Sequence, residues 1–377
     1  MRVAYIGQKG LPATYGGVER HVEELAVRLA ARGLTPCVYN RPHYNPAPPR
    51  VYRGVEVVTL PSIATKHLDA ISHVALCTAH ALWRRVDIVH YHAIGPALLS
   101  WAPRLAGAGA VVTVHGRDWQ RPKWGEAASL ALRGGEWVAM RAPDETVVVS
   151  QSLAGELSAR YGRAARFIPN GIKLEEGDDP GVLDELGLEA GRYVLFASRL
   201  VPEKGAHYLV EAWRRCNGDL ALVMAGDSSF SEDYVRSLHA MCAGDVVFPG
   251  YVFGARLATL FRNAALFVLP SDLEGLPIVL LEALGYGTPV LASDIPPNRE
   301  VLGDLGRTFR AGDVDDLRRQ LDAVLDELPA LRAQATEAAA WIADEYDWDA
   351  VADQTLALYE SVLRSRGSRR RPGAAPV

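Results

Sequence analysis

The segment SDLEGLPIVLLEALGYGTPVLASD carries the residues with the clearest chemical potential. Glu274 and Glu282 stand eight positions apart with an apolar run between them, and Pro277 suits the first helical position. The first amides of a helix have no partner within it, so they can bind an anion. Those amides would belong to Gly275, Leu276 and Ile278. The pattern predicts an anion site, although a carboxylate before a helix also simply stabilises the helix start.

Two cations lie near the end of another expected strand, residues 193–198. Arg199 ends this strand, and Lys204 follows five residues later in RLVPEKG. Open α/β sheets bind ligands outside the carboxyl ends of their strands, so both cations are placed to meet a ligand. Two cations there suit a diphosphate, whereas each of them alone is equally well explained as surface charge.

A glycine-rich loop, QKGLPATYGGVER, follows the first expected strand. Gly16 and Gly17 would let the backbone approach a ligand closely at the start of a helix. A nicotinamide site is disfavoured, because GxGxxG is absent and the second strand ends in Tyr39-Asn40 rather than in an acid. A turn without any ligand remains open. Glu19 could reach a ligand or merely begin the helix.

A second segment, HGRDWQRPKWG, follows a buried strand and has residues suited to sugars. Trp119 and Trp124 could stack on sugar rings, and Asp118 could accept hydrogen bonds from hydroxyls. Either Trp could equally pack in the domain core. His115, which opens the segment, is either a site residue or a buried histidine with its hydrogen bonds satisfied.

Short apolar runs alternate with helical patterns, which predicts parallel sheets covered by helices on both faces. In the helix expected at 18–32, Val18, Val22, Leu25 and Leu29 share one face. The strands expected in the first half are 2–6, 35–39, 55–60, 87–92, 110–115, 145–150 and 165–169. Those expected in the second half are 193–198, 220–225, 246–248, 265–269 and 289–292.

These patterns divide the chain into two doubly wound α/β domains. Residues 171–191 are acidic, contain Gly and Pro, and suit a linker. Closing helices are expected at 314–328, 329–345 and 348–365, followed by a disordered tail, 366–377.

The composition excludes several classes of protein. Across 377 residues, 49% are hydrophobic and 23% are charged, which is typical of a globular chain. The four cysteines are scattered, which argues against a zinc site or a disulfide scaffold and fits the cytoplasm. Residues 1–165 carry 19 Lys and Arg against 12 Asp and Glu, and the remainder carries 21 against 33. The basic residues do not cluster into a nucleic-acid motif, so no nucleic-acid partner is expected.

Together these residues resemble the retaining, nucleotide-sugar-dependent glycosyltransferases of family 4, which have the GT-B fold. The family's pieces occur in order along nearly the whole chain: Gly16-Gly17, His115, Asn170-Gly171, Arg199 and Lys204, Ala225-Gly226, Glu274-x7-Glu282 and Tyr346-Asp347-Trp348. The two segments GQKGLPATYGGVER and HGRDWQRPKWG look like a subgroup with rhamnosyltransferase-like enzymes of bacterial surface-polysaccharide assembly.

The resemblance implies a role for each matching residue. Arg199 and Lys204 would bind the donor diphosphate, Glu274 would lie beside the transferred sugar, and Glu282 would hold the ribose. Gly16, Gly17 and Gly226 would line the donor, and His115 would face the sugar. The family's aromatic-Gly pair after Glu-Gly is here Leu276-Pro277, which removes one amide donor.

The implied architecture is two Rossmann-like domains that face each other across a cleft. Residues 1–170 would bind the acceptor with Glu19, Asp118, Trp119 and Trp124, and residues 192–345 would bind the nucleotide sugar. Residues 346–365 would form a helix that crosses back to the first domain.

The expected reaction moves a sugar to a glycan or lipid-linked acceptor with retention of configuration. No DxD motif is present to hold a metal on the diphosphate, so neither a metal ion nor a cofactor is expected. Two alternatives remain, a GT-B nucleotide-sugar 2-epimerase and a non-catalytic binding protein.

The first half also suggests a weak peripheral contact with a membrane. The helix expected at 66–85 has an apolar stripe, with Trp83 near its end and basic residues at both ends. The stripe consists of Leu68, Ile71, Ala75, Leu76, Ala79 and Leu82. Packing of most of this stripe on the sheet is at least as well supported by the sequence, so the contact is expected to come from loops and charged ends rather than from the whole stripe.

Overall fold

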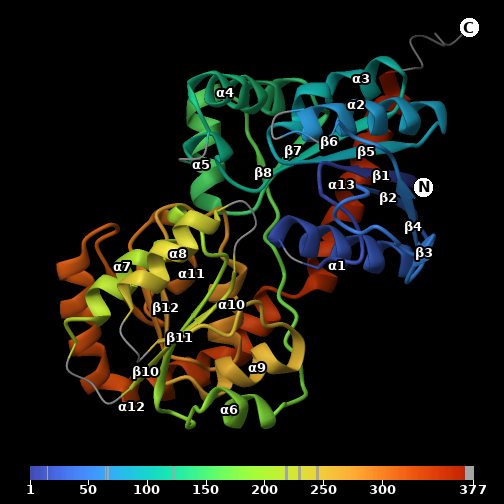
Figure 1. The fold of residues 1–377 in the computed structure, drawn as a ribbon. Helices are drawn as coiled ribbons and strands as arrows, with labels where there is room; N and C mark the ends of the chain where they lie inside the picture. The colour runs from blue at the N-terminus through green and yellow to red at the C-terminus, as the bar shows by residue number, and fades with distance from the viewer. Residues whose placement is uncertain are drawn as a thin grey trace, which may run out of the picture. The chain divides into compact units, whose positions relative to one another are not determined.

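The computed structural model describes residues 1–14, 16–63, 65, 68–121, 124–216, 220–227, 231–242 and 246–369. The chain divides into two compact units, and Figure 1 shows the elements of each. Unit 1 comprises Met1–Gly171 and Trp348–Val377, and unit 2 comprises Ile172–Asp347. The segment expected as a linker, 171–191, instead belongs almost entirely to unit 2, where it includes the helix α6 (Gly181–Leu186).

Unit 1 is built on an eight-stranded sheet in the order β3-β4-β2-β1-β5-β6-β7-β8. All pairs in it are parallel except β3 with β4. The central strands are buried on both faces, which explains their continuous apolar sequences. The strands are β1 (Arg2–Ile6), β2 (Thr35–Asn40), β3 (Val51–Tyr52), β4 (Val55–Thr59), β5 (Ile88–His92), β6 (Gly109–Val114), β7 (Glu145–Val148) and β8 (Arg166–Phe167).

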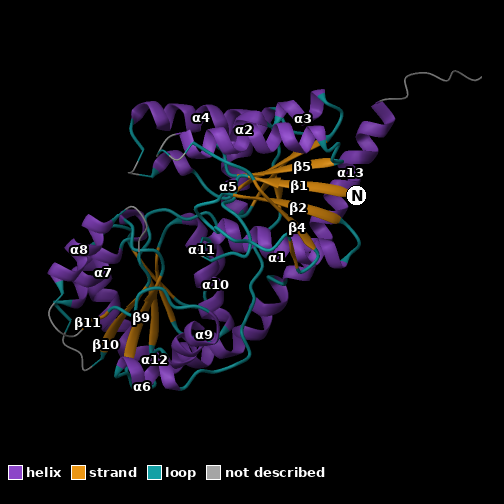
Figure 2. Cartoon of the chain, turned by 45° about the vertical axis from the view of Figure 1, so that its right-hand side comes forward, coloured by secondary structure: helices purple, strands orange, loops and turns teal. Residues whose placement is uncertain are grey.

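Helices cover both faces of this sheet (Figures 1 and 2). They are α1 (Gly17–Ala31), α2 (Leu68–Trp83), α3 (Trp101–Leu105), α4 (Glu126–Arg141), α5 (Gln151–Tyr161) and α13 (Trp348–Arg369), with short 3₁₀ turns η1 (Pro96–Leu99) and η2 (Asp118–Gln120). Val22, Leu25 and Leu29 of α1 are buried in the core, as the stripe predicts.

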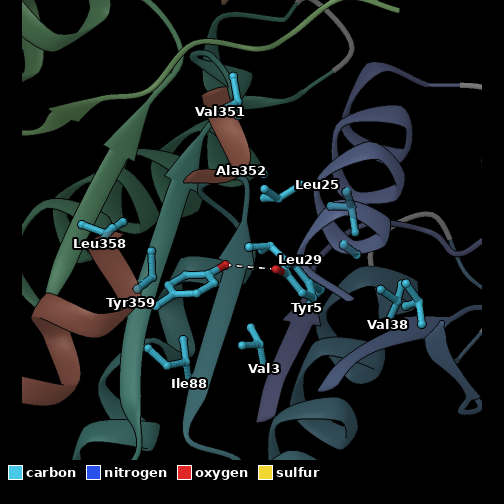
Figure 3. Close-up of a cluster of buried hydrophobic side chains, with 14 of the residues drawn as sticks. Val3, Tyr5, Leu25, Leu29, Val38, Ile88, Val351, Ala352, Leu358 and Tyr359 are labelled. Atoms are coloured by element: carbon cyan, nitrogen blue, oxygen red, sulfur yellow. Dashed lines mark hydrogen bonds between the residues drawn. The ribbon is translucent and has the colours of Figure 1, made fainter. Parts of the chain in front are cut away.

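The last helix, α13, completes the core of unit 1. Tyr359 is fully buried, and its hydroxyl lies 3.2 Å from that of Tyr5 on β1, as Figure 3 shows. Val351, Ala352 and Leu358 pack in the same cluster. α13 runs to Arg369, so the first residues of the tail expected to be disordered are helical, and Arg366 pairs with Asp144 at 3.0 Å. Residues 370–377 lie outside the described part of the chain.

Unit 2 is built on a six-stranded parallel sheet in the order β11-β10-β9-β12-β13-β14. The strands are β9 (Tyr193–Ala197), β10 (Ala221–Ala225), β11 (Val246–Val247), β12 (Leu266–Leu269), β13 (Val290–Ser293) and β14 (Arg307–Phe309). The helices are α6, α7 (Ala206–Trp213), α8 (Glu232–Met241), α9 (Gly254–Asn263), α10 (Ile278–Gly285), α11 (Pro296–Leu302) and α12 (Val314–Glu345), with the 3₁₀ turn η3 (Pro202–Lys204).

The two helices expected at 314–328 and 329–345 form one helix, α12, which continues through Pro329. The expected boundary falls at Pro329, and proline disfavours a helix interior because it lacks an amide donor and clashes with the preceding turn. Here Leu321 and Val324 before the proline and Leu331 after it are all buried in the core of unit 2. Tertiary packing on both sides therefore outweighs the local cost.

The structure decides between the two interpretations of the apolar stripe of α2. Its buried residues are His73, Val74, Cys77, Thr78 and Ala81, whereas the predicted apolar stripe is exposed or half-buried. Ile71 is 63% exposed and Leu68 is 47% exposed. The helix begins at Leu68, and residues 66 and 67 of the predicted helix lie outside the described residues. The alternative that most of the stripe packs on the sheet is therefore wrong.

Candidate active site

Each sheet has a topological switch point, that is, a pair of neighbouring strands from which the strand order extends outward in both directions. In unit 2 this point lies between β9 and β12, because β10 and β11 extend one side and β13 and β14 the other. Ligands of open α/β sheets bind outside the carboxyl ends of the strands at such a point. The loops that follow β9 and β12 carry Arg199, Lys204 and Glu274. The topology thus brings together residues that lie some 70 positions apart.

Lys204 and Glu274 are in direct contact. Lys204 Nζ lies 2.5 Å from Glu274 Oε1, and the Ser271 hydroxyl donates to the same oxygen at 2.7 Å. Both charged side chains are largely buried, with 14% and 8% of their surfaces exposed. The Ser271 carbonyl in turn accepts a hydrogen bond from Ser293 Oγ at 2.5 Å. This chain of contacts holds the Glu274 carboxylate and the Lys204 ammonium in fixed positions.

Close backbone approaches shape the same edge of the sheet. Gly226 has φ 150°, and a Cβ there would lie 1.8 Å from the Ser198 carbonyl oxygen. Gly205 has φ 68°, and a Cβ there would lie 1.9 Å from the Pro270 carbonyl oxygen. Only glycine fits either position, so the loops after β9, β10 and β12 can lie against one another. Arg199 is half-buried beside them, and its guanidinium makes no hydrogen bond or ion pair with the residues that the structure describes.

Helix α10 begins one residue later than predicted. Pro277 is its N-cap, with ψ 93°, and Ile278 is its first helical residue. Pro277 was expected at the first helical position, but its extended conformation places it outside the helix. The amides of Ile278 and Val279 then open the helix without partners inside it. Glu282 is 5% exposed on this helix, and the backbone of Gly275 and Leu276 leads into it from Glu274.

The corresponding point in unit 1 lies between β1 and β5. Gly17 is the first residue of α1, and Gly16 is its N-cap with φ 105°. Glu19 Oε1 accepts a hydrogen bond from the Lys9 amide at 3.1 Å. A Cβ added to Gly16 would clash with Glu19 Oε2. Glu19 is 7% exposed, so this carboxylate holds the glycine loop against the helix start. The helix-starting interpretation of Glu19 fits this position better than acceptor binding.

His115 lies in a cluster of histidines at the same edge. Its Nε2 is 3.0 Å from His92 Nδ1, and its ring meets that of His21 edge to face at 4.8 Å. Burial holds the pKa of both His92 and His115 well below the usual value, and neighbouring histidines lower both further. Burial also lowers the pKa of His21 to about 4, against the opposing effect of its hydrogen bond with Asn170. These rings are therefore neutral at pH 7.

The aromatic segment after β6 is held by its own neighbours. Trp119 Nε1 donates to Glu136 Oε2 at 2.8 Å, and the Arg133 guanidinium lies 4.5 Å from its ring centroid. Asp118 forms an ion pair with Arg121 at 2.9 Å. The half-buried Trp124 donates a hydrogen bond from its amide to the Arg121 carbonyl at 3.2 Å. Trp119 is therefore chiefly a packing residue, which is the alternative to sugar stacking that the sequence left open.

Comparison with known proteins identifies the family. A model described as "Glycosyltransferase Family 4" matches residues 15–176, and one described as "Glycosyl transferases group 1" matches residues 184–342. The chain is a family 4 glycosyltransferase of the GT-B fold. Sucrose-phosphate synthase from Thermosynechococcus elongatus has the same fold, with a TM-score of 0.82 and 22% identity over 97% of this chain and 99% of that one.

Other proteins resemble this glycosyltransferase along almost its whole length. Anabaena HepE in complex with UDP and glucose has a TM-score of 0.79 and is 20% identical, over 96% of this chain and 100% of that one. Phosphatidyl-myo-inositol mannosyltransferase of Mycobacterium leprae is 29% identical over 93% of this chain and 94% of its own length. Glycogen synthase of Mycobacterium tuberculosis is 27% identical over 100% and 98% of the two chains.

Sequence reasoning missed several residues of this glycosyltransferase's candidate site. Ser271 and Ser293, which position Glu274, carry no pattern that separates them from loop serines. His92 and His21 were also missed, although β5 reads IVHYH, and two histidines in a buried apolar strand are an unusual signal. Both histidines lie close to His115 only because of the order of the strands in the sheet.

Proposed function

We propose that this glycosyltransferase moves a sugar from a nucleoside-diphosphate sugar to a glycan or lipid-linked acceptor, with retention at the anomeric carbon. Unit 2 would bind the donor, and unit 1 would bind the acceptor. The observation that carries the proposal is the buried contact of Lys204 with Glu274, beside Arg199 and the start of α10. Cations, helix amides and a carboxylate at a strand switch point suit a sugar diphosphate.

The chemistry requires stabilisation of the departing diphosphate. When the bond between the anomeric carbon and the phosphate oxygen breaks, negative charge develops on that oxygen. Lys204, Arg199 and the amides of Ile278 and Val279 would stabilise this charge. The acceptor hydroxyl would attack on the same face of the sugar, and its proton would pass to the leaving phosphate oxygen. Glu274 would lie against the sugar, and Glu282 against the ribose.

We propose that no divalent ion binds the donor diphosphate. The cations Lys204 and Arg199 and the start of α10 would supply the charge that a metal supplies in other transferases. The nearest carboxylate, Glu274, is already engaged by Lys204 and Ser271. The site therefore offers the diphosphate positive groups directly.

Unit 1 offers a surface suited to a lipid-linked acceptor. Helices α2, α3 and α4 lie in one layer on the same side of the first sheet (Figures 1 and 2). Leu98 of η1 is exposed, and so are eight large apolar side chains of these helices: Leu68, Ile71, Leu76, Trp83, Trp101, Leu105, Leu130 and Trp137. Exposed apolar area on this scale in one layer marks an interaction site.

We propose that this layer, named here the α2–α4 face, rests on an anionic membrane surface at its cytoplasmic side. Three of its exposed residues are Trp, which favours the headgroup boundary. Arg85, Arg133 and Arg141 are exposed among them, and unit 1 carries 25 Lys and Arg against 15 Asp and Glu. No helix among the described residues is both long and apolar enough to cross a bilayer. The contact would therefore be peripheral.

Stabilisation of the protein by nucleotides tests the donor assignment. Thermal unfolding would be followed with UDP, GDP, ADP and dTDP, in wild type and in Arg199→Ala. A nucleotide present at 100 times its dissociation constant stabilises by ~2.7 kcal/mol, which is easily measured. We expect one nucleotide to raise the unfolding temperature of the wild type and to have a much smaller effect on Arg199→Ala. If none of the four stabilises the wild type, the donor site is assigned wrongly.

The rhamnosyltransferase-like subgroup and a role in surface-polysaccharide assembly remain part of this proposal. The sequences GQKGLPATYGGVER and HGRDWQRPKWG support them. Trial donors should therefore include deoxyhexose nucleotides beside hexose nucleotides.

A further inference from the structure

Three histidines from distant parts of unit 1 meet at the switch point of its sheet. His21 comes from α1, His92 from the end of β5, and His115 from the loop after β6. One ring nitrogen from each lies within 4.8 Å of the other two. Imidazole nitrogens are the commonest protein ligands for zinc and related ions. Nothing in the proposed glycosyl transfer requires three such rings together.

The hydrogen bonds around the cluster leave lone pairs available. His21 Nδ1 lies 2.7 Å from Asn170 Oδ1, so this nitrogen carries the proton and His21 Nε2 has its lone pair free. His92 Nδ1 and His115 Nε2 share one hydrogen bond. When His92 donates it, the lone pair of His92 Nε2 is free, and His115 Nε2 is unprotonated. All three rings then carry an unprotonated nitrogen, and that of His115 becomes available to an ion when its hydrogen bond with His92 Nδ1 opens.

One of these nitrogens has no hydrogen-bond partner among the residues that the structure describes. His92 is fully buried, and its Nε2 makes no hydrogen bond in the structure. A buried polar atom without a partner costs about 1–3 kcal/mol, so its retention calls for an explanation. A bound ion would satisfy it.

The backbone holds His92 firmly at this position. A Cβ on Gly7 would lie 2.2 Å from the His92 carbonyl oxygen, so β1 and β5 approach each other as only glycine allows. Ala93 follows with φ 77°, a conformation that L residues rarely adopt. Its amide donates to the carbonyl of Thr113 at 2.9 Å, and Thr113 lies on β6, the strand that precedes His115. Strained backbone of this kind gathers at functional sites.

We propose that His21, His92 and His115 form a binding site for a divalent transition-metal ion of the zinc class. Asn170, which accepts from His21 Nδ1, would be the outer partner that orients a ligand ring. His115 is only half-buried, so the fourth position would open toward solvent and take water. The imidazoles suit Zn²⁺, Co²⁺ and Ni²⁺ rather than Mg²⁺ or Ca²⁺, which prefer oxygen ligands.

Ion binding must draw the three rings together. Tetrahedral zinc with nitrogen ligands at ~2.0–2.1 Å requires nitrogens ~3.4 Å apart. The present separations reach 4.8 Å. The approach of His21 and His115 would tie α1 to the loop after β6, so occupancy should raise the stability of the whole protein.

The three histidines belong to unit 1 and the proposed diphosphate-binding residues belong to unit 2, so these two sets share no residue. His115 is the residue that we expect to face the sugar, so an ion on it would compete with transfer. The following test uses neither nucleotide nor acceptor. Its result is therefore independent of whether the proposed function holds.

Cobalt spectroscopy tests the site directly. The full-length protein would be treated with a chelator, dialysed and titrated with Co²⁺, and Zn²⁺ would then be added in competition. We expect visible absorption typical of tetrahedral cobalt at one ion per chain, its loss on addition of Zn²⁺, and a raised unfolding temperature with either ion. If no such absorption appears and neither ion raises the unfolding temperature, the proposal is wrong.

Matched variants locate the ion. His92→Gln should abolish the tetrahedral spectrum, and Asn170→Ala should weaken Zn²⁺ binding by about 10–100-fold. His43→Gln, an exposed histidine of the same unit, should bind as the wild type does. If His92→Gln does not fold, as judged by circular dichroism, His21→Gln takes its place. Equal affinity in the wild type and in the cluster variants would mean that the ion binds elsewhere, and would overturn the proposal.

Discussion

Lys204 Nζ lies 2.5 Å from Glu274 Oε1, although the two residues follow different strands of the second sheet. The ion pair keeps a largely buried cation and a largely buried carboxylate together when no donor is bound. An incoming diphosphate carries more negative charge than Glu274, so it would compete for the same ammonium. Glu274 would then be released toward the sugar. The pair would thus link donor binding to the position of the carboxylate.

Replacement of Lys204 by Ala should reduce kcat/KM for transfer by at least about 100-fold, since one missing donor in such a site costs ~10²–10³ in rate. Steady-state kinetics with circular dichroism as a check on folding would measure this. Lys173→Ala is the matched control, because Lys173 is an exposed lysine of the same unit, and it should retain wild-type rates. A folded Lys204→Ala protein with wild-type turnover would remove Lys204 from the mechanism.

Transfer should continue in excess EDTA at a rate no lower than that seen without it. The physical reason is that Arg199, Lys204 and the first amides of α10 supply the positive charge that the diphosphate needs. Initial rates with and without the chelator, after dialysis against it, make the comparison. Lost activity that returns with Mg²⁺ or Mn²⁺ would show that an ion carries part of this charge.

The α2–α4 face should bind vesicles that contain phosphatidylglycerol. Basic residues near an anionic surface contribute about 1 kcal/mol each, so added salt should reverse the binding. The double variant Ile71→Ser with Trp83→Ser should reduce co-sedimentation by about tenfold, because both side chains are exposed and would enter the interface. Trp341→Ser removes an exposed tryptophan of unit 2 and should behave as the wild type. Equal recovery of wild type with neutral and anionic vesicles at low salt would contradict this contact.

Stability should fall as the pH is lowered from 7 to 5, partly through His73. This side chain is fully buried on α2, and burial lowers its pKa to about 4. The unfolded chain takes up the proton near pH 6.5 and the folded chain does not, so acid favours unfolding. The effect of one such histidine is about 2 kcal/mol between pH 7 and pH 5.

Urea unfolding at both pH values, in wild type and in His73→Gln, measures this contribution. The variant starts from a lower stability, but it should lose about 2 kcal/mol less than the wild type over this range. Identical losses in the two proteins would show that His73 is not the neutral, buried group that the structure describes.

The sequence predicted most strands to within two residues, because the runs buried on both faces are continuously apolar, as in YVLFA of β9. It missed β3 and β14, which have only two and three residues and so show no periodicity. It also placed a break at Pro329, where packing on both sides sustains the helix.

The site was predicted in part, for a related reason. Motif residues such as Lys204 and Glu274 have types and spacings that a sequence shows. Ser271 and His92 matter only through the strand order, which brings loops together that no local pattern connects. The sequence left open which side of α2 is exposed, because His73 and Thr78, both polar, occupy its buried face.

Transfer of labelled sugar tests the central claim most directly. UDP-, GDP-, ADP- and dTDP-sugars labelled in the sugar would be incubated with the full-length protein and a lipid and glycan extract, and the label in the lipid or glycan fraction would be counted. The account predicts that one donor gives a labelled acceptor, and that Lys204→Ala reduces the transfer at least about 100-fold. Label that stays in the nucleotide sugar with every donor, whether unchanged or as an epimer, would contradict it.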